Sequence, residues 1–432
     1  MISRPLRIRR ELLAETATRD PLDAIELAPG EPAFYWRSDE RDVEIAALGA
    51  VAVVESSGRT RFRDAIAQLE SLRATIDDVD GDWPLAVGGF AFDDAAPGPT
   101  WTGFPPLRLF VPRMLWVRRG AVTRMIVAYA AGRAQTPASL LACNGVSPCD
   151  GRSTSFAAAD EPASDWHRRV SSAVDAIRAG EIEKVVLARR HTARCRAPIA
   201  LLVRALAEAR PSCFTFLVRW NGRAFAGSSP ERLLRLDQGR IDADALAGSA
   251  GRGHSAAHDE ALARELLASP KDQREHRIVS DAIRDALAPF ACEIDVPEQP
   301  VVQRLPEAHH LHTPIRARLA PGKTSHLLSI AERLHPTPAV CGAPREDACR
   351  RLAAEEPDRG WYGGGIGWIG ASGDGELAVA LRAALIDADA AHVWAGAGIV
   401  EGSSPEREFD ETERKMASIL PYFERGTNEC AA

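Results

Sequence analysis

The feature that most constrains the fold of this chain is a short turn between two strand-like runs. Residues 213–220 are rich in β-branched and aromatic residues, and only Asn221-Gly222 separates them from a second, shorter strand-like run at 223–227. Asn-Gly strongly favours a two-residue β-hairpin turn, because both central positions of that turn need a positive φ. The sequence therefore predicts antiparallel strand pairing at this point.

The rest of the chain mixes strand-like and helix-like segments. Strand-like segments lie at 51–54, 85–92, 107–117, 125–130 and 184–188, and 363–386 alternates like a further hairpin. Helical patterns lie at 61–77, 164–179, 257–268, 272–287, 327–334, 345–355 and about 406–423. Strand pairs joined by tight turns, with helices between them, predict an α+β protein. We expect a single large α/β sandwich of mainly antiparallel sheets with flanking helices.

A segment rich in Ser, Ala, Pro and Gly divides the chain. It runs from 134 to 163 and has the composition of a surface connection. We expect residues 1–150 to form a strand-rich part of the same fold and residues 164–424 to form the region that carries the chemistry.

Bulk composition excludes several classes of protein. The net charge of −7 and the isoelectric point of about 5.9 argue against a nucleic-acid binder, which normally has a basic face. No apolar run reaches the length of a membrane span, and the first residues lack the apolar stretch of a signal peptide. None of the eight cysteines forms a C-x-x-C pair, so neither a zinc site nor a dithiol redox motif is indicated. We expect a cytoplasmic protein with free thiols.

Lysine is rare in this chain. Of 53 Lys plus Arg residues only four are lysines, at positions 184, 271, 323 and 415. Arginine serves wherever a generic cation is needed, whereas only an ammonium can lose its proton and act as a base near neutral pH. A remaining lysine is therefore either a chance surface residue or a residue that arginine cannot replace.

Two motifs that suggest other functions fail on their context. Gly365-Ile-Gly-Trp-Ile-Gly370 matches the dinucleotide-binding pattern, but a turn and an apolar strand follow it where a helix should open. His309-His310-Leu-His312 offers metal ligands without a second ligand cluster. Such adjacent histidines are more often structural or in contact with a substrate.

The helix expected at 272–287 carries a carboxylate on its apolar face. One turn before the stripe of Val279, Ala282 and Ala286 stands Glu275. A carboxylate on the inward face needs a partner, because burying it bare is costly. A metal ion would serve, and so would a buried salt bridge or the helix dipole.

The last expected helix places Glu408, Glu411 and Lys415 on one stripe. By itself this spacing is more often a solvated ion pair than a site. It follows a strand, 394–400, which ends in Gly396 and Gly398. Glycines at a strand end allow a ligand to approach the backbone closely.

Seven stretches in order resemble the chorismate-utilising enzymes, namely isochorismate, salicylate, anthranilate and aminodeoxychorismate synthases. They are Glu183-Lys-Val-Val-Leu-Ala-Arg189, Gly227-Ser-Ser-Pro-Glu-Arg-Leu-Leu234, Leu246-Ala-Gly-Ser-Ala-Gly-Arg252, Pro270-Lys-Asp-Gln-Arg-Glu-His276, Leu334-His-Pro-Thr-Pro-Ala-Val340, Ala395-Gly-Ala-Gly-Ile-Val400 and Glu408-Phe-Asp-Glu-Thr-Glu-Arg-Lys415. The N-terminal region resembles the family more loosely, through Phe34-Tyr-Trp36, Gly88-Gly-Phe-Ala-Phe92 and Phe110-Val-Pro-Arg113. The resemblance implies a fold like that of anthranilate synthase component I and makes 164–424 the chorismate-binding catalytic region.

The resemblance also implies a Mg²⁺ site and a substrate site. The metal ligands would be Glu275 and Glu411, and Mg²⁺ would bridge to the ring carboxylate of chorismate. The expected substrate-binding residues match family positions that contact carboxylates, the ring or the neighbouring backbone: Gly248, Ser249, His310, Arg382, Gly396 and Lys415.

Two further residues would carry the reaction. A nucleophile adds at C2 of the ring while the C4 hydroxyl leaves, and Glu231 matches the family's general acid; apolar neighbours such as Leu233 should raise its pKa. Members of the family that use water have a lysine base where anthranilate synthases tend to have glutamine. Lys184 stands there, and burial beside Val186 would favour its neutral amine.

These matches favour an isochorismate synthase, an isomerase that converts chorismate to isochorismate by water addition. Salicylate synthase is the alternative, although Ala308-His-His-Leu-His-Thr313 departs from the usual salicylate synthase pattern. Anthranilate and aminodeoxychorismate synthases fit less well, because the loop at 247–252 lacks their Gly-Thr-Arg-Pro-Arg-Gly pattern. A chorismate-binding subunit with a dead site is the non-enzymatic alternative, and the intact Lys184, Glu231, Glu275 and Glu411 argue against it. The resemblance suggests a monomer and leaves open siderophore, menaquinone and salicylate biosynthesis.

Overall fold

The computed structural model describes residues 8–15, 20–26, 28–77, 83–130, 161–195, 197–322, 325–356 and 358–424. Most of the connection expected at 134–163 lies outside these residues. Up to residue 130 the elements are β1 (Ile8–Glu15), α1 (Pro21–Glu26), β2 (Ala33–Ser38), β3 (Val43–Ser56), α2 (Arg61–Arg73), β4 (Ile76–Asp77), β5 (Pro84–Phe90), β6 (Leu107–Arg119) and β7 (Val122–Ala130).

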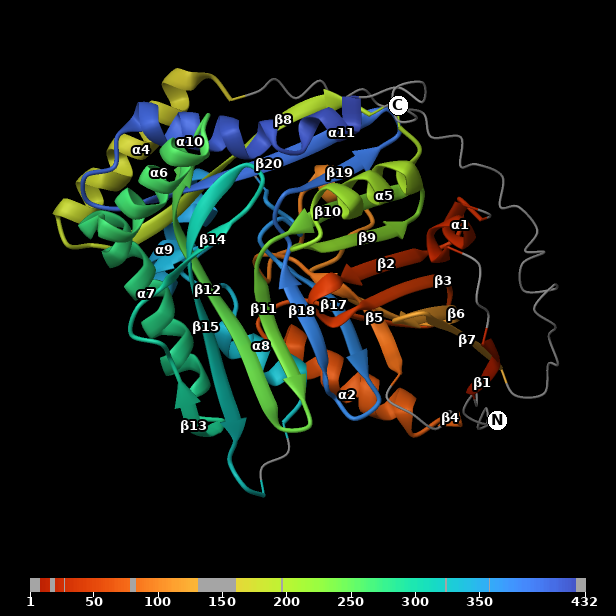
Figure 1. Cartoon of the computed structure of the whole chain (residues 1–432). Helices are drawn as coiled ribbons and strands as arrows, with labels where there is room; N and C mark the ends of the chain where they lie inside the picture. The colour runs from red at the N-terminus through yellow and green to blue at the C-terminus, as the bar shows by residue number, and fades with distance from the viewer. Residues whose placement is uncertain are drawn as a thin grey trace.

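The second part of the chain alternates strands and helices more evenly (Figure 1). Its first elements are α4 (Ala163–Arg178), β8 (Lys184–Arg194), α5 (Ile199–Ala209), β9 (Phe214–Trp220), β10 (Arg223–Ser229), β11 (Arg232–Asp237), β12 (Arg240–Gly251), α6 (Ala256–Ala268) and α7 (Pro270–Leu287). They are followed by β13 (Ala291–Asp295), β14 (Val301–Arg304), β15 (Ala308–Leu319), α8 (Leu327–Leu334), β16 (Gly342–Ala343), α9 (Arg345–Glu355), β17 (Gly365–Gly370), β18 (Gly375–Val379), β19 (Ala383–Asp387), β20 (Ala390–Ile399), α10 (Pro405–Ala417) and α11 (Leu420–Glu424).

The strands form one continuous sheet that folds back on itself at β6. One arm runs β6–β3–β2–β9–β10–β19–β20–β8–β16, and the other runs β6–β5–β17–β18–β11–β12–β15. Both arms begin at β6 because β3 pairs with β6 along its length and β5 pairs with it at 107–110. Among the described residues, every pairing is antiparallel except that of β1 with β4. The antiparallel α+β sandwich expected from the sequence is confirmed.

Three apolar clusters hold the layers together. The cluster between the two arms is rich in aromatic residues, among them Trp36, Phe110, Phe216 and Trp394. A second cluster packs the outer face of the first arm against α1, α5 and α11. A third cluster lies under α2, α4, α7, α8 and α9. Alternate residues of one strand enter different clusters, so each sheet face is buried and both strands and helices are needed to cover it.

Several local predictions are confirmed by the structure. Strands β9 and β10 pair across Asn221 and Gly222, which have φ of 50° and 76°. The glycines of Gly365–Gly370 lie within strand β17, so they open no nucleotide-binding helix. No helix in the described ranges is long and apolar enough to cross a membrane.

The expected helix at 406–423 is instead two helices. Helix α10 ends at Ala417 and α11 begins at Leu420. Pro421 accounts for the break, since proline has no N–H to continue the hydrogen bonds of the preceding helix. The expected helix at 61–77 also ends early, at Arg73, and its last residues form the short strand β4.

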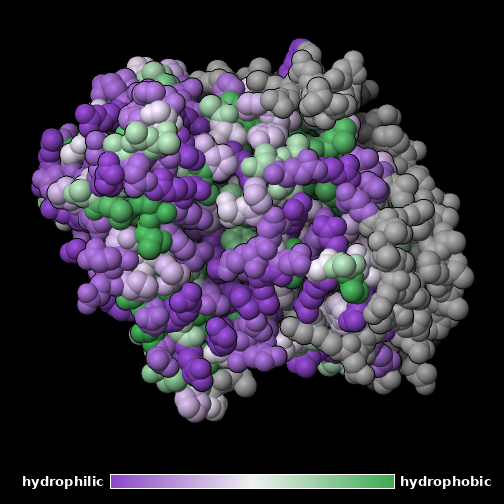
Figure 2. All heavy atoms as spheres, viewed as in Figure 1, coloured by the Kyte–Doolittle hydropathy of each residue, from purple (hydrophilic) through white to green (hydrophobic). Residues whose placement is uncertain are grey.

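The outer surface seen in Figure 2 is mostly hydrophilic, with small separate apolar areas. The apolar side chains named above are buried. Among the described residues, the large apolar residues that are exposed are few: Val53, Val122, Leu267 and Val301.

Candidate active site

A cavity of about 500 Å³ lies where α7 and α10 pack over the ends of both arms. Helix α7 packs against β12 and β15, and α10 packs against β20 (Figure 1). Nine of the ten residues expected from the sequence line this cavity: Glu231, Gly248, Ser249, Glu275, His310, Arg382, Gly396, Glu411 and Lys415. Residues as far apart along the chain as Glu231 and Lys415 therefore share one site, as the ordered motifs predict.

The tenth residue, Lys184, does not line the cavity but contacts Glu275, which does. It begins strand β8, its side chain is fully buried, and its Nζ is 3.0 Å from Oε1 of Glu275. Two of the partners expected for Glu275 are therefore compatible with the structure. Its carboxylate faces the cavity, where a metal ion could bind, and it also forms a buried salt bridge with Lys184. A lysine without exposed surface is not a chance surface residue.

Gly398 explains why the strand below the site ends in glycines. A Cβ built at Gly398 would lie 2.2 Å from Oε1 of Glu275 and 3.2 Å from Cε of Lys184. Any side chain at this position would therefore separate the lysine from the glutamate. Glycine was expected to admit a ligand, and Gly398 admits the two protein side chains as well.

The carboxylate of Glu411 is held by Lys415, one helical turn further along α10. Nζ of Lys415 is 2.7 Å from Oε1 of Glu411, and it also donates to the carbonyl oxygen of Gly396 at 2.7 Å. Burial alone would raise the pKa of Glu411, but the charge and hydrogen bond of Lys415, with a hydrogen bond from Ser249, lower it to about 2. Glu411 is therefore an anion across the whole neutral range.

A bulge in β12 carries the loop residues into the cavity. The register of β12 on β15 shifts between Ala247 and Ser249, and Gly248 has φ of 78°. The bulge places Ser249 opposite His310 of β15, so both line the cavity. Burial lowers the pKa of His310 to about 3, with help from the charges of Arg382 and Lys415. The imidazole is neutral at pH 7 and can serve as a hydrogen-bonding group.

Glu231 has the opposite environment to Glu411. Its side chain is 2% exposed, and Oε1 has no hydrogen-bond partner among the described residues. Burial raises the pKa of Glu231 to about 8, and the negative charge of Asp244 adds to the rise. The expectation of a raised pKa among buried neighbours such as Leu233 agrees with this environment. Glu231 therefore holds a proton at neutral pH.

Arg382 lies in the tight turn between β18 and β19 and points its charge into the cavity. Its φ is 48°, a conformation that non-glycine residues rarely adopt. Gly227 permits this turn, because a Cβ there would lie 2.5 Å from the carbonyl oxygen of Arg382. Oε1 of Glu307 lies 3.4 Å from Nε of Arg382 and 2.8 Å from Arg210. The glycine of the Gly227-Ser-Ser-Pro-Glu231 motif therefore serves the arginine as well as the acid.

Comparison with known proteins identifies the family of this chain. The family model described as "Chorismate binding enzyme" matches residues 9–424. The chain belongs to this chorismate-binding enzyme family. The salicylate biosynthesis isochorismate synthase of Pseudomonas aeruginosa is 34% identical over 95% of this chain and 90% of that protein.

Solved structures of chorismate-binding enzymes share the fold. The menaquinone-specific isochorismate synthase of Escherichia coli has 27% identity and a TM-score of 0.78, over 98% of this chain and 97% of its own. Anthranilate synthase component I from Streptococcus pneumoniae has 22% identity and a TM-score of 0.67, over 97% and 93%. The second likeness concerns the fold alone, and it confirms the expected resemblance to anthranilate synthase component I.

This chorismate-binding enzyme has further cavity residues to which the sequence assigned no role. Lys271 and Glu408 both line the cavity and form an ion pair of 3.1 Å, and Asp272, which also lines it, would lie 3.1 Å from a Cβ built at Gly248. Lys271 was one of four lysines, so its rarity was an available signal. Glu408 shares the stripe of Glu411 and Lys415, and that stripe was the signal for it.

The three histidines at 309, 310 and 312 have three different surroundings. Nε2 of His309 is 3.0 Å from Asp259, and Nε2 of His312 is 3.1 Å from Asp244. Only His310 faces the cavity. The three side chains therefore do not converge on one point, which agrees with their interpretation as structural or substrate-contacting residues.

The carboxylates of the cavity fit a hard divalent cation. Burial raises the pKa of Asp272, and the charges of Glu275 and Glu411 raise it further; burial and the charge of Glu411 likewise raise the pKa of Glu408. Such crowding of anions is relieved by a cation with oxygen ligands. Among the described residues no cluster of three or more His, Cys, Asp or Glu side chains has the spacing of a complete metal site, so substrate oxygens or water would have to supply the remaining ligands.

Proposed function

We propose that this chain is an isochorismate synthase that converts chorismate to isochorismate with Mg²⁺. The observation that carries the proposal is the pair of titratable groups at one cavity: a buried lysine amine, Lys184, and a protonated carboxyl group, Glu231. Water addition with loss of a hydroxyl needs one group to accept a proton and another to donate one. The names of the two isochorismate synthase relatives support the same reaction.

The charges of the cavity support a dianionic substrate together with a divalent metal. Five cations line the cavity: Lys271, Arg382, Arg407, Arg414 and Lys415. Five carboxylates other than Glu231 oppose them: Asp272, Glu275, Glu408, Asp410 and Glu411. With these charges balanced, Mg²⁺ would offset the two carboxylates of chorismate. Arg382 and Lys415 would bind those carboxylates, and Gly248, Ser249, His310 and Gly396 would contact the ring and its substituents.

Glu275 and Glu411 would hold the Mg²⁺ ion. Both carboxylates face the cavity from different helices, α7 and α10, and carboxylate oxygens are preferred Mg²⁺ ligands. When bound, the metal would neutralise the ring carboxylate and so favour attack of a nucleophile on the ring.

Lys184 and Glu231 would then move protons at defined atoms. As a neutral amine, Nζ of Lys184 would accept a proton from water as the oxygen bonds to C2. The carboxyl group of Glu231 donates its proton to the C4 hydroxyl, which leaves as water. Arginine cannot replace Lys184 in this role, because a guanidinium does not lose its proton near neutral pH.

The product of a direct assay tests the proposal. Purified protein with chorismate and Mg²⁺ should form isochorismate, resolved by liquid chromatography, and Lys184→Ala should lose about 10²- to 10⁴-fold in kcat. Lys184→Arg should do no better, and the melting temperature of each variant shows whether it folds. Salicylate and pyruvate as main products would instead support a salicylate synthase. Turnover only with added ammonia, or near-normal turnover by the arginine variant, would contradict the role of Lys184.

Three further proposals concern the location, the oligomeric state and the domain organisation of the enzyme. We propose a cytoplasmic enzyme, because the described cysteines are free even though Sγ of Cys341 and Cys349 are only 3.3 Å apart. We propose a monomer, as the resemblance to the family suggests. We also propose that residues 1–150 complete the scaffold while 164–424 hold the site, because the lining residues run from Val186 to Lys415. Isochorismate would then enter siderophore, menaquinone or salicylate biosynthesis.

A further inference from the structure

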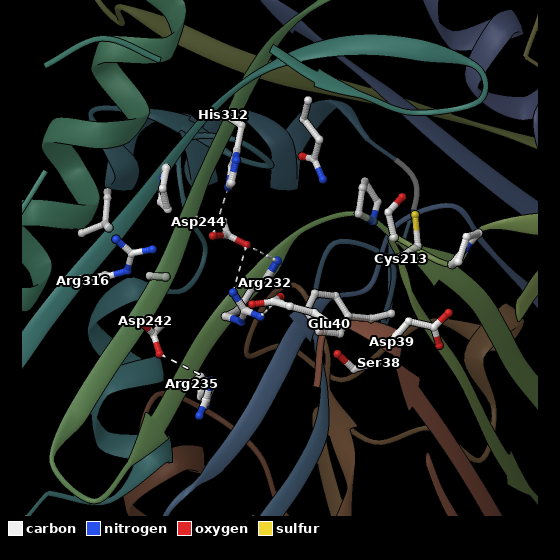
Figure 3. A pocket seen from close by; sticks show the side chains of 18 of the residues that line it. Ser38, Asp39, Glu40, Cys213, Arg232, Arg235, Asp242, Asp244, His312 and Arg316 are labelled. Atoms are coloured by element: carbon white, nitrogen blue, oxygen red, sulfur yellow. Dashed lines mark hydrogen bonds and ion pairs between the residues drawn. The ribbon is translucent and has the colours of Figure 1, made fainter. Parts of the chain in front are cut away.

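A second cavity of about 430 Å³ adjoins the first, and Pro230 lines both. Asp244 of β12 lines the second cavity, on the far side of the backbone that carries Glu231. Figure 3 shows Asp244 between Arg232 and His312, with its carboxylate directed to both. The contact with His312 is 3.1 Å, from Nε2 to Oδ1.

Asp244 binds the backbone immediately after the acid. Its Oδ2 accepts a hydrogen bond from the backbone N–H of Arg232 at 3.3 Å, and Arg232 directly follows Glu231. On the other side the carbonyl oxygen of Glu231 accepts from the N–H of Val379 at 3.0 Å. Two separate strands, β12 and the end of β18, therefore fix the peptide groups next to Glu231.

The guanidinium of Arg232 strengthens the same support. It lies 3.1 Å from Glu376 and 3.7 Å from Asp244, and it also pairs with Glu40. The side chain of Arg232 is 8% exposed and that of Glu376 is 2% exposed, so little solvent competes for these contacts. The contact that distinguishes Asp244 from Glu40 and Glu376 is its bond to the backbone beside the acid.

The charges around Glu231 oppose one another. Lys184 of β8, Arg382 of the turn before β19 and Lys415 of α10 all favour the ionised carboxylate. Burial favours the protonated form, and Asp244 is the anion that acts with it. Three cations therefore act against the proton on Glu231, and the negative charge of Asp244 opposes them together with burial.

We propose that Asp244 is a positioning residue for Glu231: its carboxylate fixes the backbone that carries the acid and places a negative charge next to it. This role rests on the proposed function, in which Glu231 donates a proton to the leaving hydroxyl. Asp244 touches neither the substrate cavity nor the reacting atoms, and it acts through the neighbouring residue.

The matched pair Asp244→Asn and Asp242→Asn tests the electrostatic part. Asp242 lies two residues earlier on the same strand and lines the same cavity, but its ion pair is with Arg235, at 3.8 Å. We expect Asp244→Asn to move the high-pH fall of kcat/KM about one unit lower, so that activity at pH 8.5 is about tenfold below wild type. At pH 6 the same variant should stay within about twofold of wild type. Asp242→Asn should leave the pH of the fall unchanged.

Two outcomes would overturn the role of Asp244. One is a pH profile of Asp244→Asn that only scales down at all pH values, as a purely structural role would give. The other is an equal displacement in Asp242→Asn, which would show a general effect of charge. Asp244→Glu, which restores the carboxylate, should return the fall toward its wild-type pH.

A readout without turnover separates this proposal from the proposed function. The difference in unfolding free energy between Glu231→Gln and its parent changes with pH as Glu231 ionises. In the Asp244→Asn background that change should end at a lower pH than in the wild-type background, and an unmoved end point would contradict the proposal. If the wild-type protein forms no isochorismate, the proposed function fails, whereas this comparison still reports the effect of Asp244 on the proton of Glu231.

Discussion

Glu231 and Glu411 line the same cavity but carry different charges at neutral pH. Glu411 lies on α10 with Lys415 2.7 Å away, and its pKa is lowered to about 2. Glu231 precedes β11, Oε1 of its carboxyl group has no partner among the described residues, and its pKa is raised to about 8. Glu231 is 2% exposed and the side chain of Glu411 is 21% exposed, but desolvation raises the pKa of both, so desolvation alone does not explain the difference.

The difference shows that partners decide the role of a buried carboxyl group. Burial raises the pKa of both glutamates, and only the direct ion pair of Glu411 reverses that effect. A permanent anion is suited to a metal ion, and a carboxyl group that keeps its proton is suited to protonate a leaving group. Substitutions of Glu231 and Glu411 should separate the role of proton donor from that of metal ligand.

Replacing the acid should abolish chemistry and spare the metal. Glu231→Gln cannot donate the proton, so we expect kcat to fall by about 10²- to 10⁴-fold while Mg²⁺ affinity stays within about twofold. Product formation by chromatography and Mg²⁺ titration by calorimetry measure the two quantities. An equal loss of kcat and of Mg²⁺ affinity would show that Glu231 takes part in metal binding.

The same variant should change how stability depends on pH. The folded pKa of Glu231, about 8, lies above the ordinary value of 4.5, so its stabilising contribution is complete below pH 4.5 and is lost as pH rises to about 8. Glu231→Gln should therefore gain stability relative to wild type across that range, on the order of 1.4 kcal/mol for each pH unit. Chemical denaturation at several pH values measures this, and a pH-independent difference would contradict the raised pKa.

Replacing the metal-side glutamate should give the reverse pattern. Glu411→Gln loses an anionic oxygen ligand and leaves Lys415 without its partner, so Mg²⁺ affinity should fall at least about tenfold. Excess Mg²⁺ should restore part of the activity, whereas it should not rescue Glu231→Gln. An unchanged Mg²⁺ dissociation constant in Glu411→Gln would exclude this residue as a ligand.

The wild-type enzyme should lose activity above the pKa of its acid. Since Glu231 must be protonated to act, kcat/KM should fall about tenfold for each unit above pH 8. Because Glu411 stays ionised down to about pH 2, Mg²⁺ affinity should not fall in the same range. Parallel profiles of kcat/KM and Mg²⁺ binding would mean that one group controls both.

The sequence predicted which residues form the site better than it predicted which side chains those residues contact. The hairpin at Asn221-Gly222 and the carboxylate on the apolar face of α7 follow from local rules, and ordered motifs brought distant residues to one site. Asp244 beside Arg232 and Glu307 beside Arg382 depend on strand register and on side chains that meet across the sandwich. No local spacing in the sequence encodes such contacts. The break at Pro421 was readable locally but was outweighed by the helical pattern on both sides of it.

In the proposed reaction, solvent water activated at Lys184 becomes the new hydroxyl group at C2. The most direct test is turnover of chorismate with Mg²⁺ in ¹⁸O-labelled water, with mass spectrometry of the isochorismate formed in a single pass. We predict one ¹⁸O atom per product molecule, carried on C2, and no labelled product from Lys184→Ala. Isochorismate without the label would mean that the hydroxyl migrates within the substrate, and that result would contradict the proposed mechanism.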